Sequence, residues 1–83
     1  MANIIVYGTE WCGGTRRVKR LLSENDLEFD YIDIDKDKIG EELVKQTNKG
    51  YRSVPTIFLP DGTTLTEPSN EKLKTTLVEI GLI

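Results

Sequence analysis

Cys12 is the only cysteine of the chain, and it lies in the stretch TEWCGGTRR, residues 9–17. A cysteine reacts as its thiolate, which attacks disulfides, so its chemistry depends on the pKa of the thiol. A lone cysteine in a small domain is more often a buried, inert residue. The two glycines that follow it, Gly13 and Gly14, would weaken a helix around a buried cysteine. They leave an exposed sulfur uncovered, so they favour a reactive thiol.

The three side chains after the glycines can stabilise the charged form of the thiol. Thr15 can donate its hydroxyl to the sulfur, and Arg16 and Arg17 add positive charge near it. Unpaired N–H groups at the start of a helix act in the same direction. We therefore predict that Cys12 has a lowered pKa and acts as a nucleophile.

A second candidate feature is the segment RSVPT, residues 52–56. If the Val54–Pro55 bond is cis, the backbone of Val54 faces outward and can pair with a peptide-like ligand. Only about 5–6% of X-Pro bonds in folded proteins are cis. The local sequence alone therefore favours an ordinary trans proline at the start of a strand.

The hydrophobic pattern predicts the elements that position these residues. Short β-branched runs indicate strands, apolar residues at helical spacing indicate helices, and an Asp-Gly pair between two strands indicates a hairpin. We expect strands at 3–8 and 28–34 and a hairpin at 55–66. We expect helices at 13–25 and from Ile39 to Thr47, and Gly50 can close the second of these helices. A final helix contains Leu73, Leu77 and Ile80. The order β-α-β-α-β-β-α predicts an α/β protein with a mixed sheet, because two strands joined by a helix pair in parallel and a hairpin pairs antiparallel.

Composition limits the class of protein. A chain of 83 residues is expected to form one domain, 1–83. No apolar run reaches the length of a membrane span, which is roughly 20 residues. One cysteine and no histidine exclude an internal disulfide framework and argue against a zinc site. The net charge of -3 argues against a nucleic-acid partner. The N-terminus lacks the pattern of a signal peptide, so we expect a cytoplasmic protein.

Other motifs have plain interpretations. The acidic run DYIDIDKD resembles a calcium loop, but Lys38 stands where a glycine is needed and Val44 where an acidic ligand is needed. We expect instead a helix cap at Asp35 or Asp37. The basic run RRVKR, residues 16–20, is interpreted as the solvated face of a helix that also attracts an anionic thiol. Trp11 is interpreted either as an exposed docking residue or as a lid on the sheet.

Three segments together resemble the glutaredoxins of the thioredoxin fold, namely YGTEWCGGTRRVKRLL, GYRSVPTIFLPDG and LTEPS. The resemblance covers nearly the whole chain and includes the small bacterial proteins of the mycoredoxin type, which have a tryptophan before the cysteine and a VPT segment. It implies a four-stranded mixed sheet flanked by three helices. It also implies a thiol–disulfide oxidoreductase that uses a low-molecular-weight thiol as co-substrate and has no tightly bound cofactor.

The resemblance assigns roles to particular residues. Cys12 matches the nucleophile and is, with Thr15, a predicted catalytic residue. Val54 and Pro55 match the cis-proline pair that binds the cysteinyl part of the small thiol. Arg52 lies where the family often has a basic residue near the carboxylate of the thiol. The full set of predicted substrate-binding residues is Trp11, Gly13, Arg16, Arg52, Val54, Pro55, Glu67, Pro68 and Ser69. Ser69 can offer N–H groups to an anion or simply cap a helix.

Two departures from the family pattern narrow the expected mechanism. Thr15 stands where related proteins commonly have a second cysteine, so no intramolecular disulfide can form. Thr9 stands where many glutathione-using members have a lysine. We therefore expect a monothiol mechanism on mixed disulfides between proteins and a small thiol, either glutathione or mycothiol. One alternative is an iron–sulfur carrier. Such carriers usually have the motif CGFS, which the CGGT of this chain matches only in part. The other alternative is a non-catalytic binding module. We expect a monomer without a metal site, a nucleic-acid partner or a membrane partner.

Overall fold

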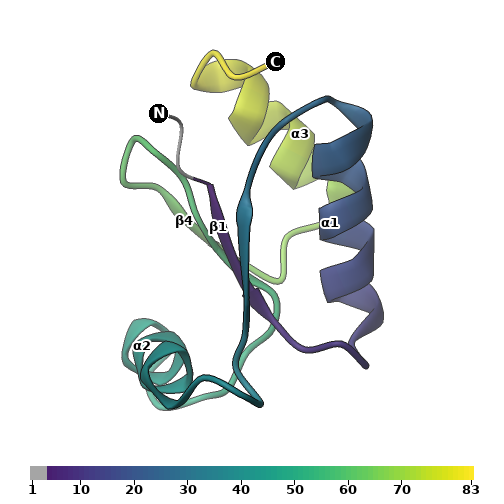
Figure 1. The fold of residues 1–83 in the computed structure, drawn as a ribbon. Coiled ribbons are helices and arrows are strands. Elements are labelled where there is room, and N and C mark those ends of the chain that lie inside the picture. The colour runs from purple at the N-terminus through teal and green to yellow at the C-terminus, as the bar shows by residue number, and fades with distance from the viewer. Residues whose placement is uncertain (1–3) are drawn as a thin grey trace.

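The computed structural model describes residues 4–83, in which four strands and three helices follow one another in the predicted order. The elements are β1 (Ile5–Gly8), α1 (Gly13–Glu24), β2 (Asp30–Asp33), α2 (Lys38–Thr47), β3 (Thr56–Phe58), β4 (Thr64–Thr66) and α3 (Asn70–Glu79) (Figure 1). Asn3, the first residue of the first predicted strand, lies outside the described residues. Within the part of the chain that the structure covers, no helix is long and apolar enough to span a membrane.

The four strands form one mixed sheet in the order β2-β1-β3-β4. β1 pairs in parallel with β2, and the opposite edge of β1 pairs antiparallel with β3, which continues into the β3–β4 hairpin. Gly62 closes the hairpin with a positive φ of 94°, in the predicted Asp61-Gly62 turn. The predicted mixed sheet is therefore confirmed, with β1 in a central position that leads directly into the loop before Cys12.

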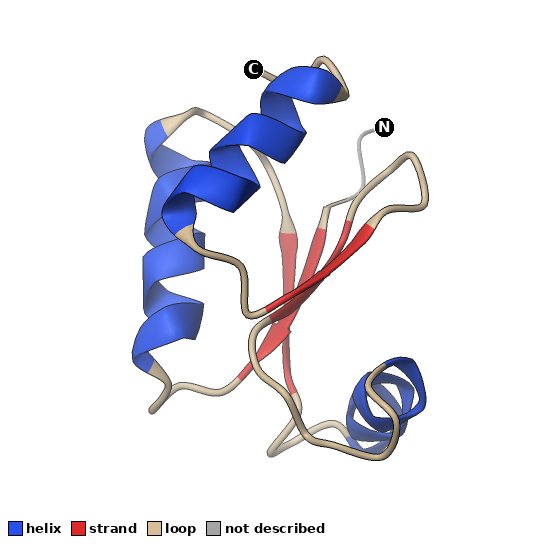
Figure 2. Cartoon of the chain, turned by 180° about the vertical axis from the view of Figure 1, so that it is seen from behind, coloured by secondary structure: helices blue, strands red, loops and turns tan. Residues whose placement is uncertain are grey.

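The helices cover the two faces of the sheet unequally. α1 and α3 lie side by side on one face, and α2 lies alone on the other (Figures 1 and 2). β1 contributes side chains to the apolar clusters on both faces of the sheet, because successive side chains of a strand point to opposite faces. Val6 packs in the cluster under α1 and α3 with Leu22, Leu73 and Leu77, whereas Tyr7 packs in the cluster that includes Val44 of α2.

The helix ends have specific caps. Asp37, one of the two predicted cap residues, accepts a hydrogen bond from the Gly40 N–H at 2.8 Å and so begins α2. After α2 the chain turns through Lys49 and Gly50, with φ of 58° and 96°, so the left-handed closure predicted at Gly50 extends over two residues. The Ser69 hydroxyl caps α3 by accepting from the Lys72 N–H at 3.0 Å.

The second strand is shorter than predicted. β2 covers Asp30–Asp33 rather than 28–34, because it is an edge strand whose four residues pair only with the four residues of β1. Leu27 and Phe29 precede the strand and still pack against the apolar cluster under α1 and α3. Their hydrophobic character therefore reflects packing from a loop rather than strand pairing.

Candidate active site

Cys12 lies at the N-cap of α1, directly after the loop that leaves the end of β1. Its backbone is extended, with φ of -85° and ψ of 121°, and its N–H donates to the Thr9 carbonyl at 3.3 Å. The side chain is partly exposed. The thiol donates to the Val54 carbonyl, with Sγ 3.7 Å from the oxygen. The structure thus brings Cys12 and Val54 into contact although they lie far apart in the sequence, as the resemblance implied.

The surroundings of Cys12 favour its charged form. Burial raises the pKa of the Cys12 thiol, but hydrogen bonds from the N–H and hydroxyl of Thr15 and from the N–H of Gly14 outweigh it, and the negative charge of Glu67 opposes them. The net result is a pKa below the ordinary value of a thiol, as predicted. The N–H donors are the free groups of the first turn of α1.

The two arginines do not contribute as predicted. Arg16 donates to the Glu10 carbonyl at 3.0 Å, and Arg17 donates to the Pro68 carbonyl at 2.9 Å and to Asn70 Oδ1 at 3.0 Å. Neither arginine is among the groups that lower the pKa of Cys12. The structure therefore gives no support to the expectation that they stabilise the thiolate, because each guanidinium donates to oxygen acceptors beside it. Arg17 instead joins α1 to the start of α3.

Thr15 is a fixed part of the site rather than a surface residue. Its side chain is 1% exposed, and its hydroxyl oxygen accepts from the Thr9 N–H at 3.4 Å while the hydroxyl also reaches the sulfur of Cys12. A Cβ added at Gly8 would lie 2.5 Å from Thr15 Oγ1, so the glycine at the end of β1 makes room for this side chain. Thr15 can therefore act as a fixed donor to the thiolate.

The two glycines after Cys12 differ in their surroundings. A Cβ at Gly13 would meet only the end of the Arg16 side chain, at 3.9 Å. A Cβ at Gly14 would lie 3.2 Å from Pro55 Cδ and 3.7 Å from Cys12 Sγ. Gly14 thus lets the first turn of α1 approach Pro55, and the prediction that a glycine keeps the sulfur uncovered applies to this residue.

The Val54–Pro55 bond is cis, as the resemblance implied and the local sequence did not. The Pro55 carbonyl accepts from the Glu67 N–H at 2.8 Å, which places the loop before α3 beside the proline. Glu67 adopts a positive φ of 49° there. Pro68 is buried, and the Ser69 hydroxyl is engaged in capping α3, so the capping interpretation of Ser69 is confirmed.

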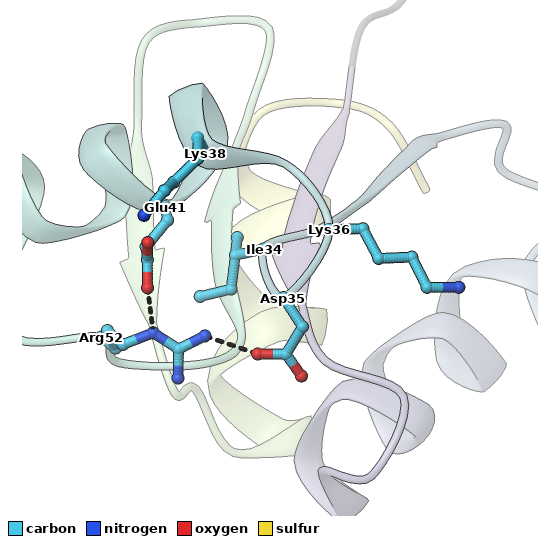
Figure 3. A pocket seen from close by; sticks show the side chains of 6 residues that line it. All are labelled: Ile34, Asp35, Lys36, Lys38, Glu41 and Arg52. Atoms are coloured by element: carbon cyan, nitrogen blue, oxygen red, sulfur yellow. Dashed lines mark hydrogen bonds and ion pairs between the residues drawn. The ribbon is translucent and has the colours of Figure 1, made fainter.

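Trp11 and Arg52 meet at a carboxylate that the sequence did not single out for this role. The Trp11 indole N–H donates to Asp35 Oδ2 at 2.8 Å, and Arg52 donates to Asp35 Oδ1 at 2.6 Å and to Glu41 Oε2 at 2.5 Å (Figure 3). Trp11 remains 66% exposed, so the interpretation as a lid on the sheet is wrong. These side chains come from three loops and α2, and nothing in the local sequence pairs them.

A polar pocket surrounds this carboxylate–guanidinium cluster. Its volume is about 340 Å³, and it is lined by Ile34, Asp35, Lys36, Lys38, Glu41 and Arg52 (Figure 3). Among residues 4–83, no group of three or more His, Cys, Asp and Glu side chains is arranged to hold a metal ion. The candidate site therefore consists of a thiol with a lowered pKa, a cis-proline loop and a pocket lined mostly by charged groups, which Asp35 joins to Trp11.

A cysteine at the start of the first helix, beside a cis-proline, in a fold of the order β-α-β-α-β-β-α, defines the thioredoxin-like class. The solved glutaredoxin of Archaeoglobus fulgidus has this fold, with a TM-score of 0.71 and 26% identity over 90% of this chain and 85% of that one.

Sequence comparison identifies the family within this class. A family model described as glutaredoxin matches residues 4–63. A Mycobacterium tuberculosis protein named as a glutaredoxin is 40% identical over 79 residues, which cover 95% of this chain and 94% of the relative. Mycoredoxin 1 of Corynebacterium glutamicum is 41% identical over 68 residues, which cover 82% of this chain and 84% of the relative. The chain belongs to the glutaredoxin family, as the resemblance of its motifs predicted.

Proposed function

We propose that this protein is a thiol–disulfide oxidoreductase that acts by a monothiol mechanism on mixed disulfides between proteins and a small thiol. The observation that carries the proposal is the position of Cys12. Its thiol has a lowered pKa and lies beside the Val54 carbonyl, and the chain contains no second cysteine. Such a site suits exchange in which the resolving thiol comes from solution.

The proposed reaction has two exchange steps. First, the Cys12 thiolate attacks the small-thiol sulfur of the mixed disulfide. The S–S bond of the mixed disulfide breaks, the protein leaves as a thiolate, and Cys12 carries the small thiol as a new disulfide. Second, the thiolate of another small-thiol molecule attacks that disulfide, releases Cys12 as a thiolate and forms the disulfide of the small thiol. One disulfide is consumed and one is formed, so the substrate protein is reduced by one small-thiol molecule from solution, which leaves as a disulfide with the small thiol that the protein carried.

The residues around Cys12 have separate parts in this proposal. Thr15 and the N–H of Gly14 stabilise the thiolate as attacker and as leaving group. The backbone of Val54, turned by cis-Pro55, binds the cysteinyl part of the small thiol, and exposed Trp11 contacts the thiolated protein. Glu67, Pro68 and Ser69 border the opposite end of the bound thiol, as the family pattern implies. Gly13 and Arg16 complete the wall beside the sulfur.

We propose glutathione or mycothiol as the small thiol. The family supports a thiol of this class, and the similarity to a protein named mycoredoxin 1 supports mycothiol as one of the two. We further propose that the protein works as a monomer in the cytoplasm, where small thiols keep cysteines reduced.

A turnover assay with each small thiol tests this function. A protein substrate carrying one mixed disulfide is incubated with the enzyme and either glutathione or mycothiol, and release of the protein thiol is followed. We expect catalysis with at least one of the two and none with Cys12→Ser, since a hydroxyl at neutral pH is a much poorer nucleophile. A protein substrate with an intramolecular disulfide should be reduced far more slowly. Absence of turnover with both small thiols contradicts the proposal.

A further inference from the structure

Arg52 is held between two carboxylates, which changes what this arginine can bind. Its Nε donates to Glu41 and its Nη2 donates to Asp35, at 2.5 and 2.6 Å. The side chains of Arg52 and Asp35 are about equally exposed, at 36% and 39%, whereas that of Glu41 is 17% exposed. The Arg52 guanidinium thus faces two carboxylates, in a pocket whose lining also includes Lys36 and Lys38.

This pairing opposes the role that the family resemblance gives to Arg52. Arginine binds a carboxylate through paired N–H donors and opposite charge. Here the Nε and one terminal nitrogen already donate to carboxylates. A ligand carboxylate at Arg52 would have to displace Asp35 or Glu41, or would meet their negative charge. In Figure 3 the Lys36 side chain points away from Arg52. Besides Arg52, the positive charges of Lys45 and Lys38 help to lower the pKa of Glu41, whereas the cation that lowers the pKa of Asp35 is Arg52. Asp35 is therefore the carboxylate that most directly opposes a ligand carboxylate at Arg52.

The same carboxylate connects the pocket to the reactive cysteine. Asp35 Oδ2 accepts the indole N–H of Trp11 at 2.8 Å, and Trp11 directly precedes Cys12 in the chain. This bond joins the pocket lining to the residue next to Cys12, the side toward which we expect the distal part of a small thiol attached to Cys12 to extend. The pocket lining offers carboxylate oxygens as acceptors and N–H groups as donors, a set suited to neutral hydrogen-bonding groups.

We propose that Asp35 is a specificity-determining residue of this site. Asp35 and Glu41 together occupy two donor nitrogens of Arg52, so a small thiol that ends there in a carboxylate gains no advantage over one whose distal part is uncharged and hydrogen-bonding. This inference rests on the proposed function, because it concerns the small thiol of that reaction.

The test compares two reductants that differ by one charge, glutathione and its ethyl ester at the glycine carboxyl group. The rate of the second exchange step is measured as kcat/KM for each reductant at low ionic strength. For the native protein we expect the two values to agree within about twofold, as for a site with little net attraction for a carboxylate. A preference for free glutathione of more than about fivefold overturns the proposal.

Asp35→Asn is the decisive variant, because asparagine keeps the size and an oxygen acceptor for Trp11 while it removes the charge. We expect the kcat/KM ratio of glutathione to its ester to rise by about fivefold, with a smaller rise in high salt. Adding Arg52→Gln should return the ratio to that of the native protein. An unchanged ratio in Asp35→Asn, or a gain that survives Arg52→Gln, contradicts the proposal.

Glu42→Gln is the matched control, because it removes one carboxylate from the same helix as Glu41 at an exposed residue outside the pocket lining. Its ratio should equal that of the native protein, and a rise like that of Asp35→Asn would mean that general surface charge, not Arg52, sets the preference. The same turnover measurements separate the specificity proposal from the proposed function. Turnover with either reductant leaves the proposed function standing whatever the ratio, whereas no turnover with glutathione, its ester or mycothiol removes that function itself.

Discussion

At the scale of single residues, Thr15 links the fold to the reactivity of the thiol. Its buried hydroxyl accepts from the Thr9 N–H and also stabilises the charged sulfur of Cys12. One hydroxyl can do both, since it has one proton to donate and lone pairs to accept with. The residue that occupies the position of a second cysteine is therefore itself a contributor to the low pKa.

Replacing Thr15 by valine tests this contribution. Thr15→Val keeps the shape and removes the hydroxyl, so the pKa of Cys12 should rise, and the increase of activity with pH should move to higher pH. Thr15→Ser keeps the hydroxyl and should titrate close to the native protein. The ultraviolet absorbance of the thiolate measures both. Equal midpoints for Thr15→Val and the native protein would show that the hydroxyl has no part in the lowered pKa.

The same substitution should change how stability depends on pH. Because the pKa of Cys12 is lowered in the folded state, the thiolate contributes stability at pH values above the pKa of the unfolded thiol, and this contribution is lost as pH falls through the folded pKa. Thr15→Val should reduce that part of the pH dependence. It should also remove the acceptor of the buried Thr9 N–H. Stability at every pH should therefore fall by about 1–3 kcal/mol, the cost of a buried donor left without a partner.

A second cysteine in place of Thr15 should change the mechanism. Thr15→Cys retains a small buried side chain beside the space that Gly8 leaves. We expect oxidation to form a disulfide with Cys12, seen by mass spectrometry as the loss of two hydrogen atoms. The reduced variant should also gain activity in reducing a protein disulfide. The Cys12→Ser/Thr15→Cys double variant is the control and should show neither. Failure of Thr15→Cys to form the disulfide while folded would mean that this position cannot serve as a resolving cysteine.

At the scale of elements, the site depends on how closely the start of α1 approaches the loop before β3. The two glycines of α1 are not equivalent in this contact, since only Gly14 faces Pro55. Arg17 reinforces the arrangement by joining α1 to the Pro68 carbonyl ahead of α3. The helix start, the cis-proline and the loop before α3 thus form one assembly around the sulfur.

A matched pair of alanine variants tests this asymmetry. In Gly13→Ala the added methyl group meets only the end of the Arg16 side chain, in ordinary contact, so the variant should raise the free energy of unfolding by about 0.5–1 kcal/mol, because alanine suits a helix better than glycine. Its kcat/KM should stay near the native value. Gly14→Ala places a methyl group against Pro55 and the sulfur, so its kcat/KM should fall. Denaturant unfolding and turnover measure the two effects, and equal activities of both variants would contradict the role of Gly14.

The order of the elements and the position of Cys12 could be predicted because they follow from local patterns, namely apolar periodicity, glycine turns and a cap at Asp37. The cluster of Asp35, Glu41 and Arg52 could not, because each residue lies on a different segment and only the folded topology brings their charges together. Arg16 failed as a predicted contributor for a related reason. A long side chain near the sulfur in sequence is free to turn to another acceptor, here the Glu10 carbonyl.

At the scale of the whole molecule, two apolar layers hold the site elements in place. The larger lies under α1 and α3, and the smaller lies under α2, where Tyr7 and Phe58 pack edge to face with ring centroids 5.5 Å apart. Folded domains are stable by only about 5–15 kcal/mol, and a short chain lies toward the lower end of that range. Loss of one core side chain is therefore a large fraction of the stability.

Leu22 and Val78 provide a test of the larger layer. Leu22 is fully buried within that layer, whereas Val78 on α3 is exposed. Leu22→Ala should lower the free energy of unfolding by about 2–5 kcal/mol through lost burial and a residual cavity. Val78→Ala should change that free energy by about 0.5 kcal/mol at most, as is usual for a surface residue. Denaturant titration measures both. Similar effects of the two variants would contradict the assignment of the core.

The central claim is that Cys12 alone receives the small thiol from a thiolated protein. Its most direct test is a single-turnover experiment, in which the reduced enzyme is mixed with an equal amount of a protein that carries one glutathione or mycothiol as a mixed disulfide, without further reductant. Intact-mass spectrometry follows both proteins. We predict that the enzyme gains the mass of one small-thiol group as the substrate loses it, and that Cys12→Ser gains none. Transfer of the group to Cys12→Ser, or a disulfide between enzyme and substrate protein in place of the transferred small thiol, would contradict the monothiol account.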